Sequence, residues 1–209
     1  MSDNLLAYIK GLFCFDAVVQ RTDPARWDDQ SPRERWTARG VVDHNARVCF
    51  MIAEMARGNP AAVLEGAVER GRPAPSRDGF VLAPHLAQIF VRNDDDPVAV
   101  WKRMRDDVLE ALDHPGALQT EARSPWGHRT VDEFLGLAFY DPLVHAWDLA
   151  KAVGQLPVLD ATLAQRALEH LTEFGKHKEL RQPISLAAPM VTTAQDPVSQ
   201  LIAFTGRQP

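Results

Sequence analysis

The chain has 209 residues, of which 45% are hydrophobic and 24% charged, and its formal net charge is −5 at pH 7. A chain of this size can bury a core without disulfides, and its acidic balance argues against a surface for nucleic acid, which needs basic residues to neutralise phosphates. No stretch approaches the roughly 20 apolar residues that span a bilayer, and the first residues, MSDNLLAYIKG, lack the features of a signal peptide. The two cysteines, Cys14 and Cys49, both fit helical patterns, so we expect a reduced, cytoplasmic protein.

Amphipathic helices are predicted over much of the first half of the chain. Apolar spacing predicts a helix over 3–21, ended by Asp23-Pro24, and a second over 38–57, which follows the N-cap residue Thr37. A third is predicted over 97–113, with Pro97 at its first position. The segment between the second and third helices is less regular, with expectations of a short helix at 60–71, a loop at 72–79 and a helical stretch at 84–92.

The second half is predicted to be helical as well. A capping box from Thr130 to Glu133 opens a helix that runs to Val153, after a connection over 115–129. Asp160 caps a fifth helix ending near Gly175, and the tail holds an extended stretch at 183–191 and a short helix at 197–205. Strand alternation is scarce and we find no repeat or linker. The sequence predicts an all-α four-helix bundle with short extra helices, in a single domain over 1–209 whose core bundle is about 3–175 and whose C-terminal extension is about 176–209.

Polar residues on an apolar helix face are the main functional signal. On a helical wheel for 131–153, Asp141 and His145 lie at the centre of the apolar stripe and Asp148 at its margin. A charged acid in a core costs several kcal/mol unless it is compensated. The residues alone leave open a buried acid–imidazole pair without function, a general acid–base pair, or ligands of a metal.

The second predicted helix supplies a further inward donor. His44 shares its side with Val41, Val48, Met51 and other apolar residues. Helical bundles often bind metals between facing helices, and two imidazoles with one carboxylate suit zinc, nickel, iron or manganese. Asp148 could then hold the ring of His145, although a polar residue at the edge of the core is an equal alternative. No nucleotide, P-loop, serine-hydrolase or HExxH motif occurs.

Three segments carry a resemblance to a known family. The stretches WDDQSPRERWTARGVVDHNARV and SPWGHRTVDEFLGLAFYDPLVHAWDLAKAVG resemble the two signatures of the mycothiol-dependent maleylpyruvate isomerase branch of the DinB-like superfamily. The ending DPVSQLIAFTGRQP is similar to the TGR-x-P ending of an actinobacterial metal-binding subgroup. The resemblance implies a bundle that holds a divalent metal, zinc or nickel, at His44, Asp141 and His145.

The function implied by the resemblance is use of a metal-bound thiolate. It implies a transferase or isomerase that depends on a small thiol such as mycothiol, with a small electrophilic substrate; the alternatives are a metal-dependent hydrolase or a non-catalytic binding bundle. In the isomerase the carboxylate ligand is Glu, whereas here it is the shorter Asp141, followed by the helix-disturbing Pro142. The isomerase also carries an additional C-terminal domain, so we do not predict maleylpyruvate as substrate. We expect a monomer or homodimer without nucleic-acid or membrane partners.

Overall fold

A computed structural model describes residues 1–34, 36–59, 90–124, 127–174 and 188–209. The helix expected at 60–71, the loop expected at 72–79 and most of the helical stretch expected at 84–92 lie outside the described residues. In the part of the chain that the structure describes, no helix is long and apolar enough to cross a membrane.

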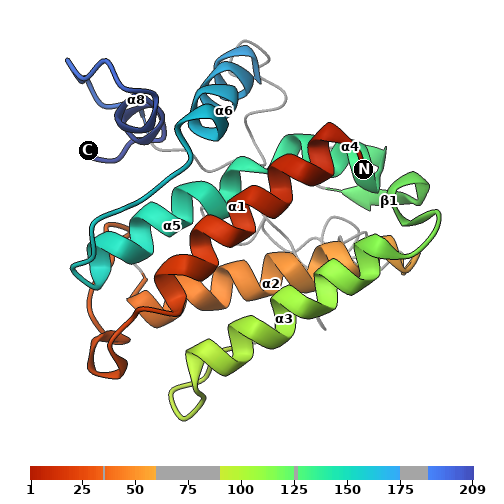
Figure 1. The fold of residues 1–209 in the computed structure, drawn as a ribbon, viewed down its shortest axis with the longest axis horizontal. Helices are drawn as coiled ribbons and strands as arrows, with labels where there is room; N and C mark the ends of the chain where they lie inside the picture. The colour runs from red at the N-terminus through yellow and green to blue at the C-terminus, as the bar shows by residue number, and fades with distance from the viewer. Residues whose placement is uncertain (35, 60–89, 125–126, 175–187) are drawn as a thin grey trace, which may run out of the picture.

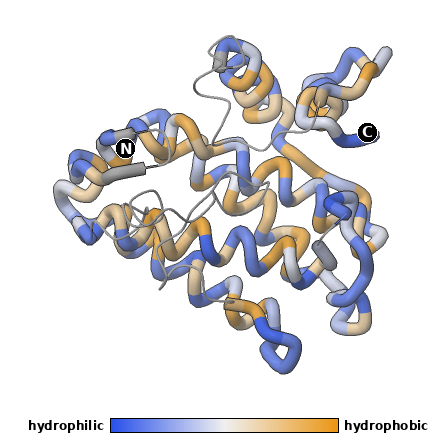
Figure 2. Tube along the Cα trace, turned by 180° about the vertical axis from the view of Figure 1, so that it is seen from behind, coloured by the Kyte–Doolittle hydropathy of each residue, from blue (hydrophilic) through white to orange (hydrophobic). Residues whose placement is uncertain are grey.

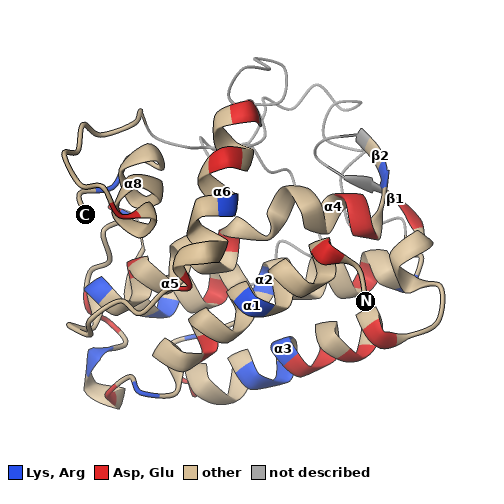
Figure 3. Cartoon of the chain, turned by 45° about the horizontal axis from the view of Figure 1, so that its top comes forward, with Lys and Arg blue, Asp and Glu red and all other residues tan. Residues whose placement is uncertain are grey.

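The predicted all-α bundle is confirmed. Its long helices are α1 (Asp3–Val19), α2 (Ala38–Ala56), α3 (Pro97–Asp113) and α5 (Tyr140–Ala152), the last preceded by α4 (Val131–Ala138). α1 lies along α5 and α2 lies along α3, and α2 also packs against α5 (Figure 1). Apolar and polar residues alternate along these helices, as amphipathic helices around one core require (Figure 2). Residues of both charge signs lie along α3 (Figure 3).

Side-chain caps fix where the helices begin. The hydroxyl of Thr37 accepts a hydrogen bond from the backbone N–H of Gly40 at 3.3 Å, and Asp96 caps α3 in the same way. The predicted capping box of Thr130 and Glu133 is present at the start of α4. These caps satisfy N–H groups that have no partner within the helix, so the starts of α2, α3 and α4 were predictable from the sequence.

The predicted helix from Thr130 to Val153 is wrong in one respect, because it is two helices. α4 ends at Ala138, Phe139 caps it, and α5 begins at Tyr140. Pro142 is the cause: it has no N–H to donate to the carbonyl of Ala138, and its ring crowds the preceding turn. The disturbance expected at Pro142 therefore appears as a break three residues earlier.

A β-hairpin occupies most of the predicted connection over 115–129 and was not predicted. Strands β1 (Glu121–Ser124) and β2 (Gly127–Thr130) pair antiparallel, with Glu121 opposite Thr130, and follow a 3₁₀ turn at Ala117–Gln119. Strands of only four residues are too short for a period-two pattern to stand out from the sequence.

The C-terminal segment returns to the bundle. After α6 (Ala161–Phe174), the described chain resumes at residue 188 and ends in α8 (Pro197–Phe204), which packs against α6 (Figure 1). Part of the stretch predicted as extended, 183–187, lies outside the described residues. The backbone N–H of Met190 donates to the carbonyl of Ala203 at 2.8 Å, so residues before α8 are tied to it.

A glycine lets α1 approach the N-terminal turn of α5. A Cβ atom built on Gly11 would lie 2.9 Å from the carbonyl oxygen of Phe139 and 3.0 Å from the ring of Pro142. Because the nearer atom is backbone, it cannot move aside as a flexible side chain could. Gly11 therefore sets the distance between α1 and the helix that carries Asp141 and His145.

We predict that Gly11→Ala destabilises the protein by about 1–3 kcal/mol, the usual cost of overpacking a core. Urea unfolding followed by circular dichroism measures the change. Gly40→Ala is the matched control, because the nearest atom to its added Cβ is 3.4 Å away and alanine favours a helix over glycine. Equal stability of the two variants would contradict the close-approach argument.

Candidate metal centre

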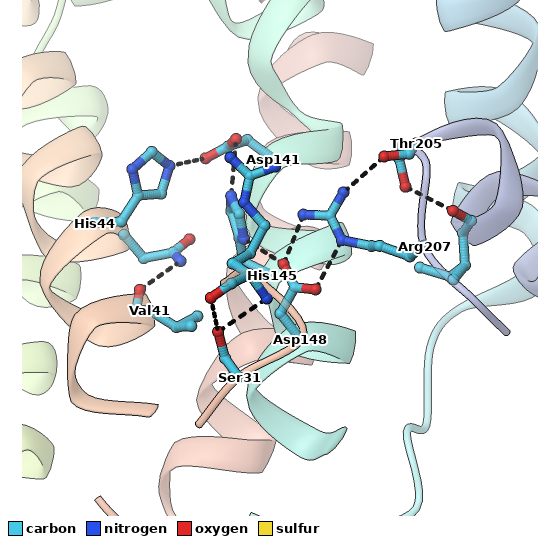
Figure 4. A network of polar contacts seen from close by, with 11 residues as sticks. Ser31, Val41, His44, Asp141, His145, Asp148, Thr205 and Arg207 are labelled. Atoms are coloured by element: carbon cyan, nitrogen blue, oxygen red, sulfur yellow. Dashed lines mark hydrogen bonds and ion pairs between the residues drawn. The ribbon is translucent and has the colours of Figure 1, made fainter. Parts of the chain in front are cut away.

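His44 projects from the second turn of α2 toward α5. The helix is fixed locally by Asp43, whose carboxylate accepts hydrogen bonds from the backbone N–H groups of Phe90 and Val91 at 2.6 and 3.0 Å. The amide of Asn45, on the other side of His44, donates to the carbonyl of Val41 at 3.0 Å. Asp43 thus ties α2 to residues 90 and 91, whereas the bond of Asn45 stays within α2, and the imidazole of His44 faces Asp141 (Figure 4).

Asp141 and His145 stand one turn apart on α5. The Oδ2 atom of Asp141 lies 3.1 Å from Nε2 of His44, and its Oδ1 atom lies 3.5 Å from Nε2 of His145. The two imidazole rings are 4.7 Å apart between centroids. One carboxylate thus faces two imidazoles from different helices, and the three residues offer ligand atoms that all lie within 4.8 Å of one another. The shorter side chain of Asp141 still reaches both rings.

A second carboxylate holds the far side of His145. Asp148 Oδ2 lies 2.8 Å from Nδ1 of His145 and accepts from Nη2 of Arg207 at 2.6 Å, while its Oδ1 accepts from Nε of Arg207 at 2.7 Å. Asp148 was expected at the margin of the core, but it is fully buried. The difference arises because Arg207, from the segment after α8, covers a side of α5 that a single-helix wheel would leave to solvent.

The loop before α2 forms a wall of the site. The carbonyl of Trp36 accepts from the backbone N–H of Ser31 at 3.0 Å and from the amide of Gln30 at 2.8 Å. The indole of Trp36 thereby stands 4.7 Å from the ring of His44 and 5.4 Å from that of His145, between centroids. Trp36 therefore contacts both imidazoles.

The pKa values of the two histidines are shifted in opposite directions. Burial lowers the pKa of His44, and the opposing effect of Asp141 does not restore it. Burial also acts to lower the pKa of His145, but Asp141 and Asp148 outweigh it and raise that pKa. Burial would raise the pKa of Asp141, yet the two imidazoles hold it well below its usual range. Asp141 is thus an anion, and His145 is the imidazole that keeps a proton more readily.

The site has a closed side and an open side. The side chain of Asp148 is 0% exposed and that of His145 is 8%, whereas those of His44 and Asp141 are 24% and 26% exposed. The site is therefore exposed to solvent on the side of His44 and Asp141. The Asp148 side is closed by protein.

Comparison with known proteins identifies the family of the chain. Residues 14–150, more than half of the chain, match the model of the mycothiol maleylpyruvate isomerase N-terminal domain. The chain belongs to this family. The matched region includes His44, Asp141, His145 and Asp148, but not Arg207.

Two relatives in Mycobacterium tuberculosis match nearly the whole chain. They are uncharacterized proteins, MT0763 of strain CDC 1551 / Oshkosh and Rv0738 of strain H37Rv. Each is 26% identical over 207 residues, which is 98% of this chain and 98% of the relative. No solved structure matches the chain.

The cysteines of this family member do not join the site. Cys14 and Cys49 are both free, as the sequence predicted. Cys49 is buried with its sulfur 3.6 Å from the hydroxyl of Tyr8, and burial raises the pKa of its thiol to about 12. A thiol with that pKa is protonated at neutral pH and is not a nucleophile. Any thiol chemistry at the site therefore needs a thiol from outside the chain.

The ion pair of Asp148 predicts how stability changes in acid. Burial would raise its pKa, but Arg207 and His145 lower it from 3.8 to about 2. Because the folded-state pKa is the lower one, this carboxylate stabilises the fold above pH 3.8 and the contribution disappears as the pH falls to about 2. The shift corresponds to about 2 kcal/mol.

We therefore expect Asp148→Asn to be less stable than wild type at pH 7, by about 3–5 kcal/mol, since it leaves Arg207 buried without a charge partner. The difference should narrow by about 2 kcal/mol between pH 4 and pH 2, as wild type loses this contribution. Urea unfolding at a series of pH values measures both quantities. A constant difference across that pH range would show that folding does not lower the pKa of Asp148.

Proposed function

We propose that the chain binds one divalent metal ion through His44, Asp141 and His145, and that it acts with a small external thiol as a transferase or isomerase. The observation that carries the proposal is the convergence of three donor atoms from two helices within 4.8 Å. Their type fits as well as their spacing, because two imidazoles and one carboxylate are a donor set for zinc and nickel and leave coordination positions open.

The surroundings of the donors support binding of a cation. Nδ1 of His145 is held by the carboxylate of Asp148, which directs Nε2 of the same ring toward Asp141. An acceptor behind a metal-binding imidazole is the common arrangement in metal sites, because it fixes the ring and its tautomer. The ionised Asp141 adds the negative charge that a cation needs in a partly buried position.

Membership of the mycothiol maleylpyruvate isomerase N-terminal family supports the choice of a thiol as partner. A bound divalent metal lowers the pKa of a coordinated thiol until it is deprotonated near neutral pH. In this proposal the thiol approaches the metal from the side of His44 and Asp141, and the indole of Trp36 restricts the directions from which it can approach. The guanidinium of Arg33 lies 5.2 Å from the centroid of that indole.

Metal content tests the site itself. Protein purified without a histidine tag and dialysed against zinc or nickel should retain about one ion per chain. His44→Ala should retain far less, because a ligand lost from a three-residue site weakens binding severely. His114→Ala is the control, since this exposed histidine lies at the end of α3. Metal content that is low in wild type and unchanged in His44→Ala would refute the metal proposal.

Calorimetry with mycothiol tests the partner. Metal-loaded wild type should bind one equivalent of thiol with measurable heat, and both metal-free protein and His44→Ala should give none. The loaded protein should then consume an electrophilic acceptor only when the thiol is present. Absence of heat together with no thiol-dependent consumption would rule out the thiol mechanism, and consumption of an ester without thiol would favour a metal-dependent hydrolase.

A further inference from the structure

A charged side chain from the last residues of the chain lies inside the fold, next to the candidate metal centre. The side chain of Arg207 is only 6% exposed, although arginine is seldom buried without a partner. Both oxygens of Asp148 receive its hydrogen bonds, at 2.7 and 2.6 Å, and Nη1 donates to the carbonyl of Thr205 at 3.1 Å. Asp148 in turn contacts the ring of His145 (Figure 4).

The end of α8 aims Arg207 at Asp148. Gly206 has a φ of +81°, its N–H donates to the carbonyl of Ala203 at 2.9 Å, and the N–H of Arg207 donates to the carbonyl of Ile202 at 3.1 Å. These bonds form a Schellman motif, the helix ending that places a left-handed residue, usually glycine, one position past the cap. The sequence Thr205-Gly206-Arg207 therefore ends the helix and turns the following side chain back toward the bundle.

Asp148 is shared between Arg207 and His145. Its Oδ2 atom accepts from Nη2 of Arg207 and faces Nδ1 of His145, so the position of the guanidinium sets the position of the oxygen that His145 meets. An ionised carboxylate can only accept hydrogen bonds, so Nδ1 of His145 is the donor. The other ring nitrogen, Nε2, then has to face Asp141 and His44.

We propose that Arg207 is a positioning residue for His145: by clamping Asp148 it fixes the ring orientation of His145 and thereby sets the affinity of the site for its metal. The clamp also occupies both oxygens of Asp148, which keeps this carboxylate behind the ring and leaves Asp141 as the carboxylate facing both imidazoles. The planar fork of arginine suits this role, because it binds both oxygens at once, whereas lysine offers a single point charge.

The role has a clear consequence for the C-terminal segment. Arg207 lies outside residues 14–150, which match the family domain, and it reaches the site only because α8 docks beside α6. The segment after α6 thus contributes to the site without supplying a ligand. This inference rests on the proposed metal site, and its test is arranged so that the two can fail separately.

The experiment compares zinc affinity in wild type and Arg207→Lys, measured by competition with a chromophoric chelator. The expected result is a loss of about 10- to 100-fold, the usual effect of removing an outer partner of a metal-binding histidine. Gly206→Ala should also weaken binding, because alanine is strained at a φ of +81° and the turn that aims Arg207 must shift. Cobalt-loaded variants should show altered visible absorption bands, since the coordination geometry changes.

Arg105→Lys is the matched control. Arg105 is a similarly shielded arginine, with a side chain 15% exposed, that joins α3 to Asp16 of α1 away from the site. The Arg105→Lys variant measures the effect of weakening an ion pair elsewhere in the bundle. Its zinc affinity and cobalt spectrum should be the same as those of wild type. Thermal unfolding of the metal-free variants places Arg207→Lys and Arg105→Lys on one stability scale.

The outcomes distinguish the positioning role of Arg207 from the proposed metal site. Zinc binding in wild type with unchanged affinity in Arg207→Lys overturns the positioning role and leaves the metal site standing. Equal losses of affinity in Arg207→Lys and Arg105→Lys overturn it as well, because the effect would then follow general stability. Failure of wild type to bind zinc overturns the proposed function and this inference with it.

Discussion

The buried charge of Asp148 is the constraint on which the candidate site depends. A carboxylate without solvent must be paired, because desolvation of an isolated charge costs several kcal/mol or more. Two residues pair with Asp148: Arg207 from the C-terminal segment and His145 from the same helix. The pairing joins α8 to α5 and orients the ring of His145. The stability of the fold and the geometry of the site therefore depend on the same hydrogen bonds.

The inward direction of the three donors could be predicted from the sequence because it is a property of single helices. Residues four apart on α5 share a face, so Asp141 and His145 had to point together once the apolar stripe was known. The same argument applied to α2 placed His44 toward the core. Caps such as Thr37 were equally local signals. The break at Phe139 was harder to predict, because a proline can either kink a helix or divide it, and because Gly11 of α1 packs closely against Phe139 and Pro142 at this point.

The partner of Asp148 could not be found in this way. Arg207 lies 59 residues further along the chain, and a helical wheel carries no information about which distant segment covers a helix face. The sequence did contain a weak signal for Arg207, since an arginine after a glycine at the end of an apolar helix fits a Schellman ending. This signal indicates how α8 ends. It does not show that the arginine enters the bundle, because that depends on the docking of α8 against α6.

The asymmetry of the site follows from these contacts and bears on its chemistry. On the closed side, Arg207, Asp148 and His145 form a chain of charge-assisted hydrogen bonds without solvent, which holds one donor in a fixed orientation. On the open side, His44 and Asp141 keep about a quarter of their side-chain surface exposed. A site that only stored an ion would gain from enclosing it on every side, since open positions favour exchange with water and small ligands. An arrangement rigid behind one imidazole and open in front of the other donors suits a cation that must accept an external ligand.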